Sequence, residues 1–283
     1  MSRIVAVHGI AQQYKGPSIL HQEWFAPLCD GISLAGGKPP ASEDLTCIFY
    51  GEYFRPKGTT SLELPYDTDD VTESYEQDLL VAWWRGAAEI EPEQVSFSKQ
   101  YMTGRTSQVV QHALEALSHS KFFAGLTERA FVFNLKQVSA YFHDDTFRNI
   151  ALRQIEKAIT DDTRVLIGHS LGSVIAYEAL CAHRSWPITT LITLGSPLGI
   201  RNLIFDQLRP PPVSGSGVWP GEAVSQWFNI ADSGDVVALV KDLRPLFGSR
   251  VENFLVHNGV TAHSASPYLT ARETGRAIIS GLG

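Results

Sequence analysis

The segment Val165-Leu166-Ile167-Gly168-His169-Ser170-Leu171-Gly172-Ser173-Val174-Ile175-Ala176 sets a serine between two apolar runs. The first run predicts a buried strand over 164–167, and the second predicts a helix over 171–183. Glycines stand two residues before and two residues after the serine. In a sharp turn from strand to helix, side chains there would collide with the neighbouring strand and helix, so Gly168 and Gly172 favour such a turn.

At this turn Ser170 stands at the predicted N-terminus of a helix. The free N–H groups and the dipole of a helix N-terminus favour developing negative charge, which suits a nucleophile. A serine that merely caps the helix after a glycine turn is the structural alternative. For His169, between the strand and the serine, we expect a packing or hydrogen-bonding role.

Strands and helices alternate on both sides of this turn. Apolar, β-branched runs predict strands over 3–7, 45–50, 189–194, 227–231 and 251–256. Apolar residues at helical spacing predict helices over 17–34, 146–160, 198–208 and 267–279, and the proline- and glycine-rich stretch 209–221 predicts a loop. The alternation predicts an α/β fold with a mostly parallel sheet and helices on both faces.

The alternation stops between residues 54 and 143. Three amphipathic helical patterns fill this stretch, over 79–87, 110–117 and 131–142. The sequence therefore predicts a core of residues 1–53 and 144–283 and a helical insertion, 54–143, that could cap a site. The insertion's aromatic residues either build its own core or shape an apolar pocket: Trp83, Trp84, Phe97, Tyr101, Phe122, Phe123, Phe131 and Phe133.

Composition narrows the class of protein. The 283 residues are 44% hydrophobic and 19% charged, as in an ordinary globular protein. A net charge of −7 argues against a nucleic-acid partner. The cysteines, Cys29, Cys47 and Cys181, are odd in number and widely spaced, which favours free thiols in a reducing compartment. No signal peptide or transmembrane segment is predicted, so we expect a cytoplasmic location.

Four segments carry a family resemblance. The serine motif resembles the nucleophile elbow of lipases and esterases in the α/β-hydrolase superfamily, and 7–10 resembles the loop that supplies their oxyanion hole. Residues 193–199 are similar to the strand end that follows the nucleophile helix. Residues 227–237 resemble the acid-bearing segment of lipase-like serine esterases, including relatives of the GPI inositol-deacylases. The resemblance implies an α/β-hydrolase fold and a catalytic triad.

The superfamily's chain order of serine, acid and histidine limits the other two members of that triad. Asp235 matches the lipase-like acid pattern best, Asp232 is the alternative, and either could instead form a turn. His263 precedes the last predicted helix, where the family's histidine usually lies, and His257 is the alternative base. The two histidines lack any standard metal-ligand spacing, and neither a metal nor a cofactor is predicted.

An oxyanion hole needs two backbone N–H groups. The elbow geometry implies that Leu171 supplies one, and the family resemblance implies that Ile10 supplies the other. Gly9 would let this loop approach closely, and His8 has an expected structural role because it precedes Ser170 in the chain.

The residues predict a serine hydrolase that cleaves a carboxylic ester, of a small or lipid-like molecule, through an acyl-enzyme on Ser170. The same triad could act on an amide, peptide or thioester, or transfer the acyl group to an acceptor other than water. An alternative of another class is a hydrolase-like module that binds a ligand without turnover. The sequence leaves the oligomeric state open.

Overall fold

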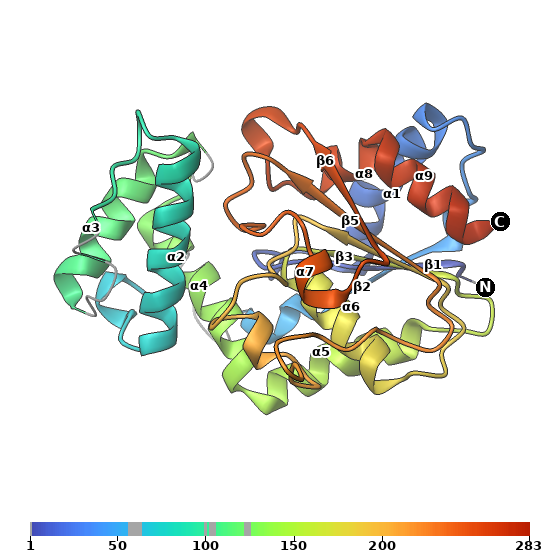
Figure 1. Ribbon diagram of the computed structural model, residues 1–283, viewed down its shortest axis with the longest axis horizontal. Helices are drawn as coiled ribbons and strands as arrows, with labels where there is room; N and C mark the ends of the chain where they lie inside the picture. Colours follow the sequence, from blue (N-terminus) through green and yellow to red (C-terminus); the bar gives the residue numbers. More distant parts are fainter. Residues whose placement is uncertain (1, 56–63, 99–100, 102–105, 122–125) are drawn as a thin grey trace.

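The computed structural model describes residues 2–55, 64–98, 101, 106–121 and 126–283 (Figure 1). In these ranges six parallel strands form one sheet in the order β2-β1-β3-β4-β5-β6. The strands are β1 (Ile4–Val7), β2 (Leu45–Ile48), β3 (Val165–His169), β4 (Thr190–Leu194), β5 (Gln226–Asp232) and β6 (Val251–Val256). The predicted α/β fold with a parallel sheet is confirmed.

Helices cover both faces of the sheet (Figure 1). One face carries α1 (Pro17–Leu34), α8 (Ala265–Thr270) and α9 (Arg272–Leu282), and the other carries α5 (Asp145–Ala158) and α6 (Leu171–Ala182). Alternate residues of a strand point to opposite faces, so β1 serves two buried clusters. Ile4 packs in the cluster that holds Leu20 of α1, and Val5 packs in the cluster that holds Val174 of α6.

Three further helices lie side by side at one end of the molecule, on the left in Figure 1. They are α2 (Ser74–Ile90), α3 (Ser107–Ser118) and α4 (Glu128–His143), and they confirm the three amphipathic patterns. Their buried residues, such as Leu79 and Leu135, belong to the same hydrophobic cluster as Val5 of the sheet. Phe122 and Phe123 lie outside the described residues.

The connection from α4 to α5 is anchored on the core. Asp144 caps α5 by accepting hydrogen bonds from the backbone N–H groups of Thr146 and Phe147. Glu178 of α6 is buried and pairs with Arg148 of α5, and it also accepts a 2.6 Å hydrogen bond from the hydroxyl of Tyr141 of α4. This buried network ties α4 and α5 to α6, the helix that begins directly after Ser170.

Two local predictions are wrong. The helix predicted over 198–208 is only a 3₁₀ turn at Phe205–Gln207, because Asn202 adopts a left-handed φ of 63° that interrupts a helix. The helix predicted over 267–279 is α8 and α9, separated at Ala271 by an extended ψ of 136°. A short helix, α7 (Arg244–Phe247), lies between β5 and β6.

The sheet order creates a crevice at one point of its carboxyl edge. From β1 the chain moves outward to β2, and it later returns to β3 and continues through β4, β5 and β6 in the other direction. In open parallel sheets, ligands bind outside the carboxyl ends of the strands where the order reverses. His8 and Gly9 follow β1 at this point, and Ser170 follows β3.

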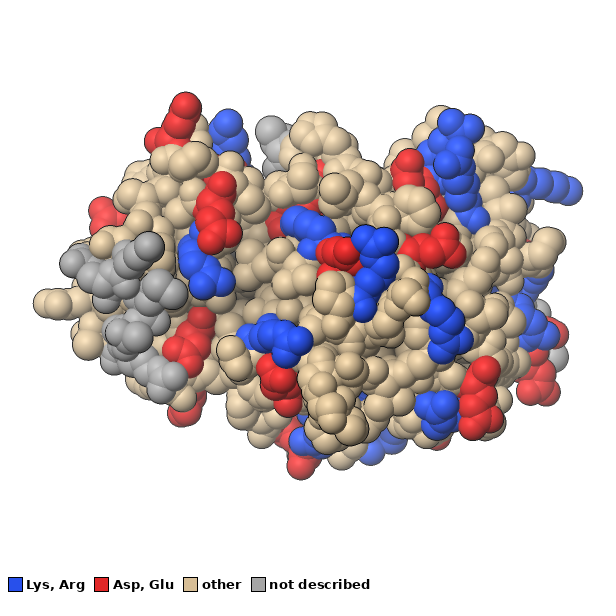
Figure 2. Space-filling view, in the orientation of Figure 1, with Lys and Arg blue, Asp and Glu red and all other residues tan. Residues whose placement is uncertain are grey.

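Charged side chains of both signs are interspersed over the face of the molecule seen in Figure 2. Among the described helices, none is both long and apolar enough to cross a bilayer.

Candidate active site

Ser170 occupies a strained turn between β3 and α6. Its φ of 53° and ψ of −129° lie in a region that residues other than glycine rarely adopt, at a cost of about 1–3 kcal/mol. A Cβ on Gly168 would lie 2.5 Å from Ser173 Cα, and one on Gly172 would lie 2.5 Å from the His8 carbonyl oxygen. The two glycines therefore let the turn pack against both β1 and its own helix.

Two hydrogen bonds link three side chains that come from distant parts of the chain. His263 Nε2 lies 2.8 Å from Ser170 Oγ, and His263 Nδ1 lies 2.8 Å from Asp235 Oδ2. An ionised carboxylate only accepts hydrogen bonds, so the neutral His263 carries its proton on Nδ1. Nε2 is then left to accept the proton of the Ser170 hydroxyl.

Asp235 is fully buried at the start of the loop after β5, and both of its oxygens are engaged. Oδ1 accepts from the backbone N–H groups of Val237 (2.9 Å) and Ala238 (3.2 Å). Oδ2 accepts from His263 and, at 2.8 Å, from the hydroxyl of Tyr268. Burial alone would raise the pKa of Asp235, but the charge and hydrogen bond of His263, with help from Tyr268, bring the pKa below its ordinary value. Asp235 is thus held as a carboxylate.

The two alternative residues have other surroundings. Asp232, at the end of β5, is buried and accepts hydrogen bonds from the backbone N–H groups of Gly234 (2.6 Å) and Asn258. It therefore fastens the turn after β5 to the segment that leads to His263. His257 is exposed. The structure brings together Ser170, Asp235 and His263.

Tyr268 and Gly195 shape this group, and the sequence reasoning missed both. Tyr268 Oη donates to Asp235 and accepts from the Asp232 N–H at 2.7 Å, so it joins the two acidic residues. Gly195 has φ 55°, and a Cβ there would lie 2.8 Å from Asp235 Oδ2 and 3.2 Å from His263 Nδ1. Gly195 lies within residues 193–199, whose family resemblance was a signal for it, whereas Tyr268 carried no sequence signal beyond its predicted helix.

The loop after β1 lies against the serine. A Cβ on Gly9 would lie 2.7 Å from Ser170 Cβ, so only glycine permits this approach. Ile10 and Leu171 line the same small cavity as Ser170. The amide of Leu171 begins α6, and amides of a first helical turn have no partner within the helix. Ile10 and Leu171, the two predicted oxyanion donors, thus flank the serine.

Two buried histidines, His8 and His169, form hydrogen bonds to the backbone of the loops around Ser170. The Tyr50 N–H donates to His8 Nε2 at 3.3 Å, so His8 Nδ1 donates to the Gly9 carbonyl at 2.6 Å. His169 Nε2 donates to the backbone carbonyl of His263 at 2.7 Å. Burial lowers the pKa of His8 to about 4, and burial together with the nearby His263 lowers that of His169 to about 3. Both rings are therefore neutral near pH 7.

A cavity of about 480 Å³ opens beside Ser170 and His263. Trp83 of α2 and Phe131 of α4 line it, and their rings meet edge to face at 5.7 Å. Trp84, by contrast, packs against Phe97 and Tyr101 within the helical stretch. Some of the described aromatic residues of this stretch therefore line the cavity, and others pack against one another.

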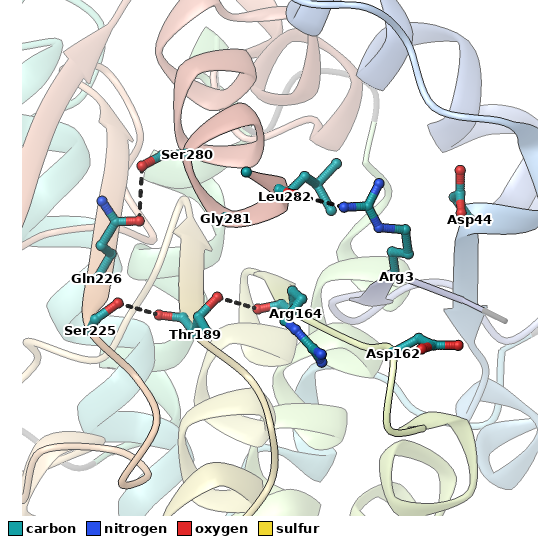
Figure 3. A pocket seen from close by; sticks show the side chains of 11 residues that line it. Arg3, Asp44, Asp162, Arg164, Thr189, Ser225, Gln226, Ser280, Gly281 and Leu282 are labelled. Atoms are coloured by element: carbon teal, nitrogen blue, oxygen red, sulfur yellow. Dashed lines mark hydrogen bonds between the residues drawn. The ribbon is translucent and has the colours of Figure 1, made fainter.

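Another cavity, of about 600 Å³, lies at the opposite, amino edge of the sheet (Figure 3). Arg3, Arg164 and Thr189 line it just before β1, β3 and β4. Several of its polar groups bond to each other or to the main chain, as in the 2.9 Å hydrogen bond from Ser280 to Gln226. Ligands of open parallel sheets bind at the carboxyl edge, so the cavity beside Ser170 is the candidate site.

Comparison with models of known protein families finds no match to this chain, and no curated protein matches it. Within the described ranges, no group of three or more histidine, cysteine, aspartate or glutamate residues could hold a metal ion.

Proposed function

We propose that this protein is a serine hydrolase of the α/β-hydrolase superfamily that cleaves a carboxylic ester through an acyl-enzyme on Ser170. The observation that carries the proposal is the continuous hydrogen-bonded chain from Ser170 through His263 to Asp235, with both links at 2.8 Å. A base within hydrogen-bonding reach of a hydroxyl, itself oriented by a carboxylate, is what activates a serine for attack.

In the first half-reaction Ser170 Oγ bonds to the ester carbonyl carbon while its proton passes to His263 Nε2. The carbonyl oxygen becomes an oxyanion, stabilised by the backbone N–H groups of Ile10 and Leu171. Asp235 stabilises the imidazolium that forms. The carbon–oxygen bond to the alcohol then breaks, and His263 gives its proton to the departing oxygen.

In the second half-reaction water replaces the alcohol. His263 Nε2 takes a proton from the water, whose oxygen bonds to the acyl carbon of the ester on Ser170. The second oxyanion collapses, the serine recovers its proton from His263, and the carboxylic acid leaves.

The strained backbone of Ser170 supports a functional role, since local strain of this kind persists where the surrounding structure enforces it.

The helices α2 and α4 contribute as a cap, through Trp83 and Phe131 in the cavity wall. The same chemistry extends to amides and thioesters, so a panel of ester, thioester and amide substrates selects among the acyl groups. The binding-module alternative predicts no covalent chemistry at all.

The test of the proposal is covalent labelling with a fluorophosphonate, followed by peptide mapping. We expect one label per chain, on Ser170, and loss of labelling and of esterase activity in Ser170→Ala. Ser33→Ala, at an exposed position of α1, is the matched control and should behave as the wild type. Full esterase activity in Ser170→Ala would refute the proposal.

A further inference from the structure

Two cavities of very different size meet at Ser170. The larger one, about 480 Å³, contains His263 in its wall together with polar groups such as Gln12 and Ser264. The smaller one holds only about 20 Å³ of free space. Among the described residues that line the smaller cavity, Ser170 supplies the polar group and the others are apolar: Ile10, Leu79, Trp83, Val138, Leu171, Pro197, Ile204 and Val237.

The walls of the small cavity are buried and come from separate parts of the fold. Leu79 lies on α2, Val138 on α4 and Ile204 in the connection after β4, and each is at most 6% exposed. Moving close-packed side chains of this kind apart to enlarge the cavity costs free energy. Measured in the same way, the small cavity has about 20 Å³ of space and the large one about 480 Å³, so the small cavity accepts only a short group.

The position of His263 decides which part of an ester enters which cavity. The departing alcohol oxygen takes its proton from His263 Nε2, so the alcohol lies on the side of that ring. Among the described residues, His263 lines only the large cavity and Leu171 only the small one, whereas Ile10, the other proposed oxyanion donor, lines both. The acyl group therefore points into the small cavity, behind the oxyanion.

We infer that the substrate is an ester of a short acyl group, acetyl or propionyl, with an alcohol larger than the acyl part. The inference rests on the proposed serine hydrolase function and adds the substrate class. A cavity of several hundred Å³ is the usual size for a small-molecule ligand, which suits the alcohol. A long fatty acyl chain does not fit behind Ser170.

The test uses p-nitrophenyl alkylphosphonates, which carry their alkyl group where an ester carries its acyl chain. Ser170 Oγ bonds to phosphorus, p-nitrophenolate leaves with the electrons of the broken phosphorus–oxygen bond, and the serine proton passes to His263. Each chain releases one p-nitrophenolate, so the rate measures access to the small cavity without turnover. We expect the methylphosphonate to react at least about tenfold faster than the octylphosphonate, after division by their rates with hydroxide.

Variants that enlarge the small cavity sharpen the test. Leu79→Ala should raise the octyl-to-methyl rate ratio at least about tenfold, and the milder Ile204→Val should raise it in the same direction. Leu28→Ala is the matched control, because Leu28 is equally buried but lies on the other face of the sheet. We expect it to leave the ratio unchanged.

The outcomes separate the two proposals. If the octylphosphonate modifies wild-type Ser170 as fast as the methylphosphonate, the short-acyl inference is wrong while the serine hydrolase stands. An unchanged ratio in both Leu79→Ala and Ile204→Val would also overturn the inference. If neither reagent modifies Ser170, the proposed function falls and the inference falls with it.

Discussion

Replacing Asp235 by asparagine should reverse the tautomer of His263. The oxygen that corresponds to Oδ1 faces two backbone N–H groups, of Val237 and Ala238, so the amide must place its oxygen there. Its NH₂ group then occupies the position of Oδ2, 2.8 Å from His263 Nδ1. A donor at that position demands an acceptor, so the imidazole moves its proton to Nε2 and can no longer take the proton of Ser170.

The size of the effect follows from this geometry. A base in the wrong tautomer loses both its acceptor function and the carboxylate that stabilises its charged form. In serine proteases a comparable change lowers kcat by about 10⁴-fold, which corresponds to about 5 kcal/mol of barrier. We expect a similar loss for Asp235→Asn, with the cavity and the serine unaltered.

The assay is kcat/KM for p-nitrophenyl acetate, with circular dichroism to check folding. Asp232→Asn is the control, because Asp232 is as deeply buried and bonds to backbone N–H groups. It should lower stability but retain activity within about tenfold, since none of its described hydrogen bonds reaches the His263 side chain. An Asp235→Asn variant with more than a tenth of wild-type activity, or a larger loss in Asp232→Asn, would refute the reasoning.

Three other predictions concern the surroundings of the site. Tyr268→Phe removes one hydrogen-bond donor from Asp235 and the acceptor of the buried Asp232 N–H. We therefore expect the free energy of unfolding in urea to fall by about 2–3 kcal/mol. An unchanged urea midpoint in this variant contradicts this role. Gly195→Ala pushes a methyl group into the space between acid and base, and kcat/KM should fall about 10²-fold in a folded protein. His8 and His169 bind protons more weakly in the folded chain, with pKa values of about 4 and about 3, than in the unfolded chain near 6.5. Stability should therefore fall as pH drops from 6.5 towards 4, by up to about 1.4 kcal/mol per pH unit for each ring, and a flat profile of urea midpoints would disagree.

Much of the fold could be predicted because its signals are local. The spacing of Gly168 and Gly172 around Ser170 and the apolar runs of the strands reflect short-range sterics and burial, which a single sequence displays. The break between α8 and α9 is different. It follows from packing on α1, where a side chain on Gly31 would collide with the Leu269 carbonyl, and no pattern within 267–279 contains that information.

The sequence predicted the residue types of the site, and the family resemblance favoured Asp235 over Asp232, but the chain itself shows little that separates the two aspartates. Asp232 and Asp235 lie three residues apart in one turn, and only the directions of their side chains separate them. That direction depends on Tyr268 and on the N–H groups of the following turn, which are tertiary contacts. The small cavity escaped prediction for the same reason, since Leu79, Val138 and Ile204 meet only in the folded chain.

The sheet and the predicted insertion contribute different parts of the proposed site. Ser170, Asp235 and His263 all follow strands of the sheet, so the core sets the geometry of the proposed proton path. The helices α2 and α4 supply Leu79, Trp83 and Val138 to the small cavity, so in the proposed enzyme they limit the size of the acyl group. The helix α4 also contacts the loop after β1. Gln137 accepts a 3.2 Å hydrogen bond from the Ala11 N–H, next to the proposed oxyanion donor Ile10. Substitutions in the cavity wall should thus change which ester is cleaved, whereas loss of the Gln137 contact should slow every ester alike.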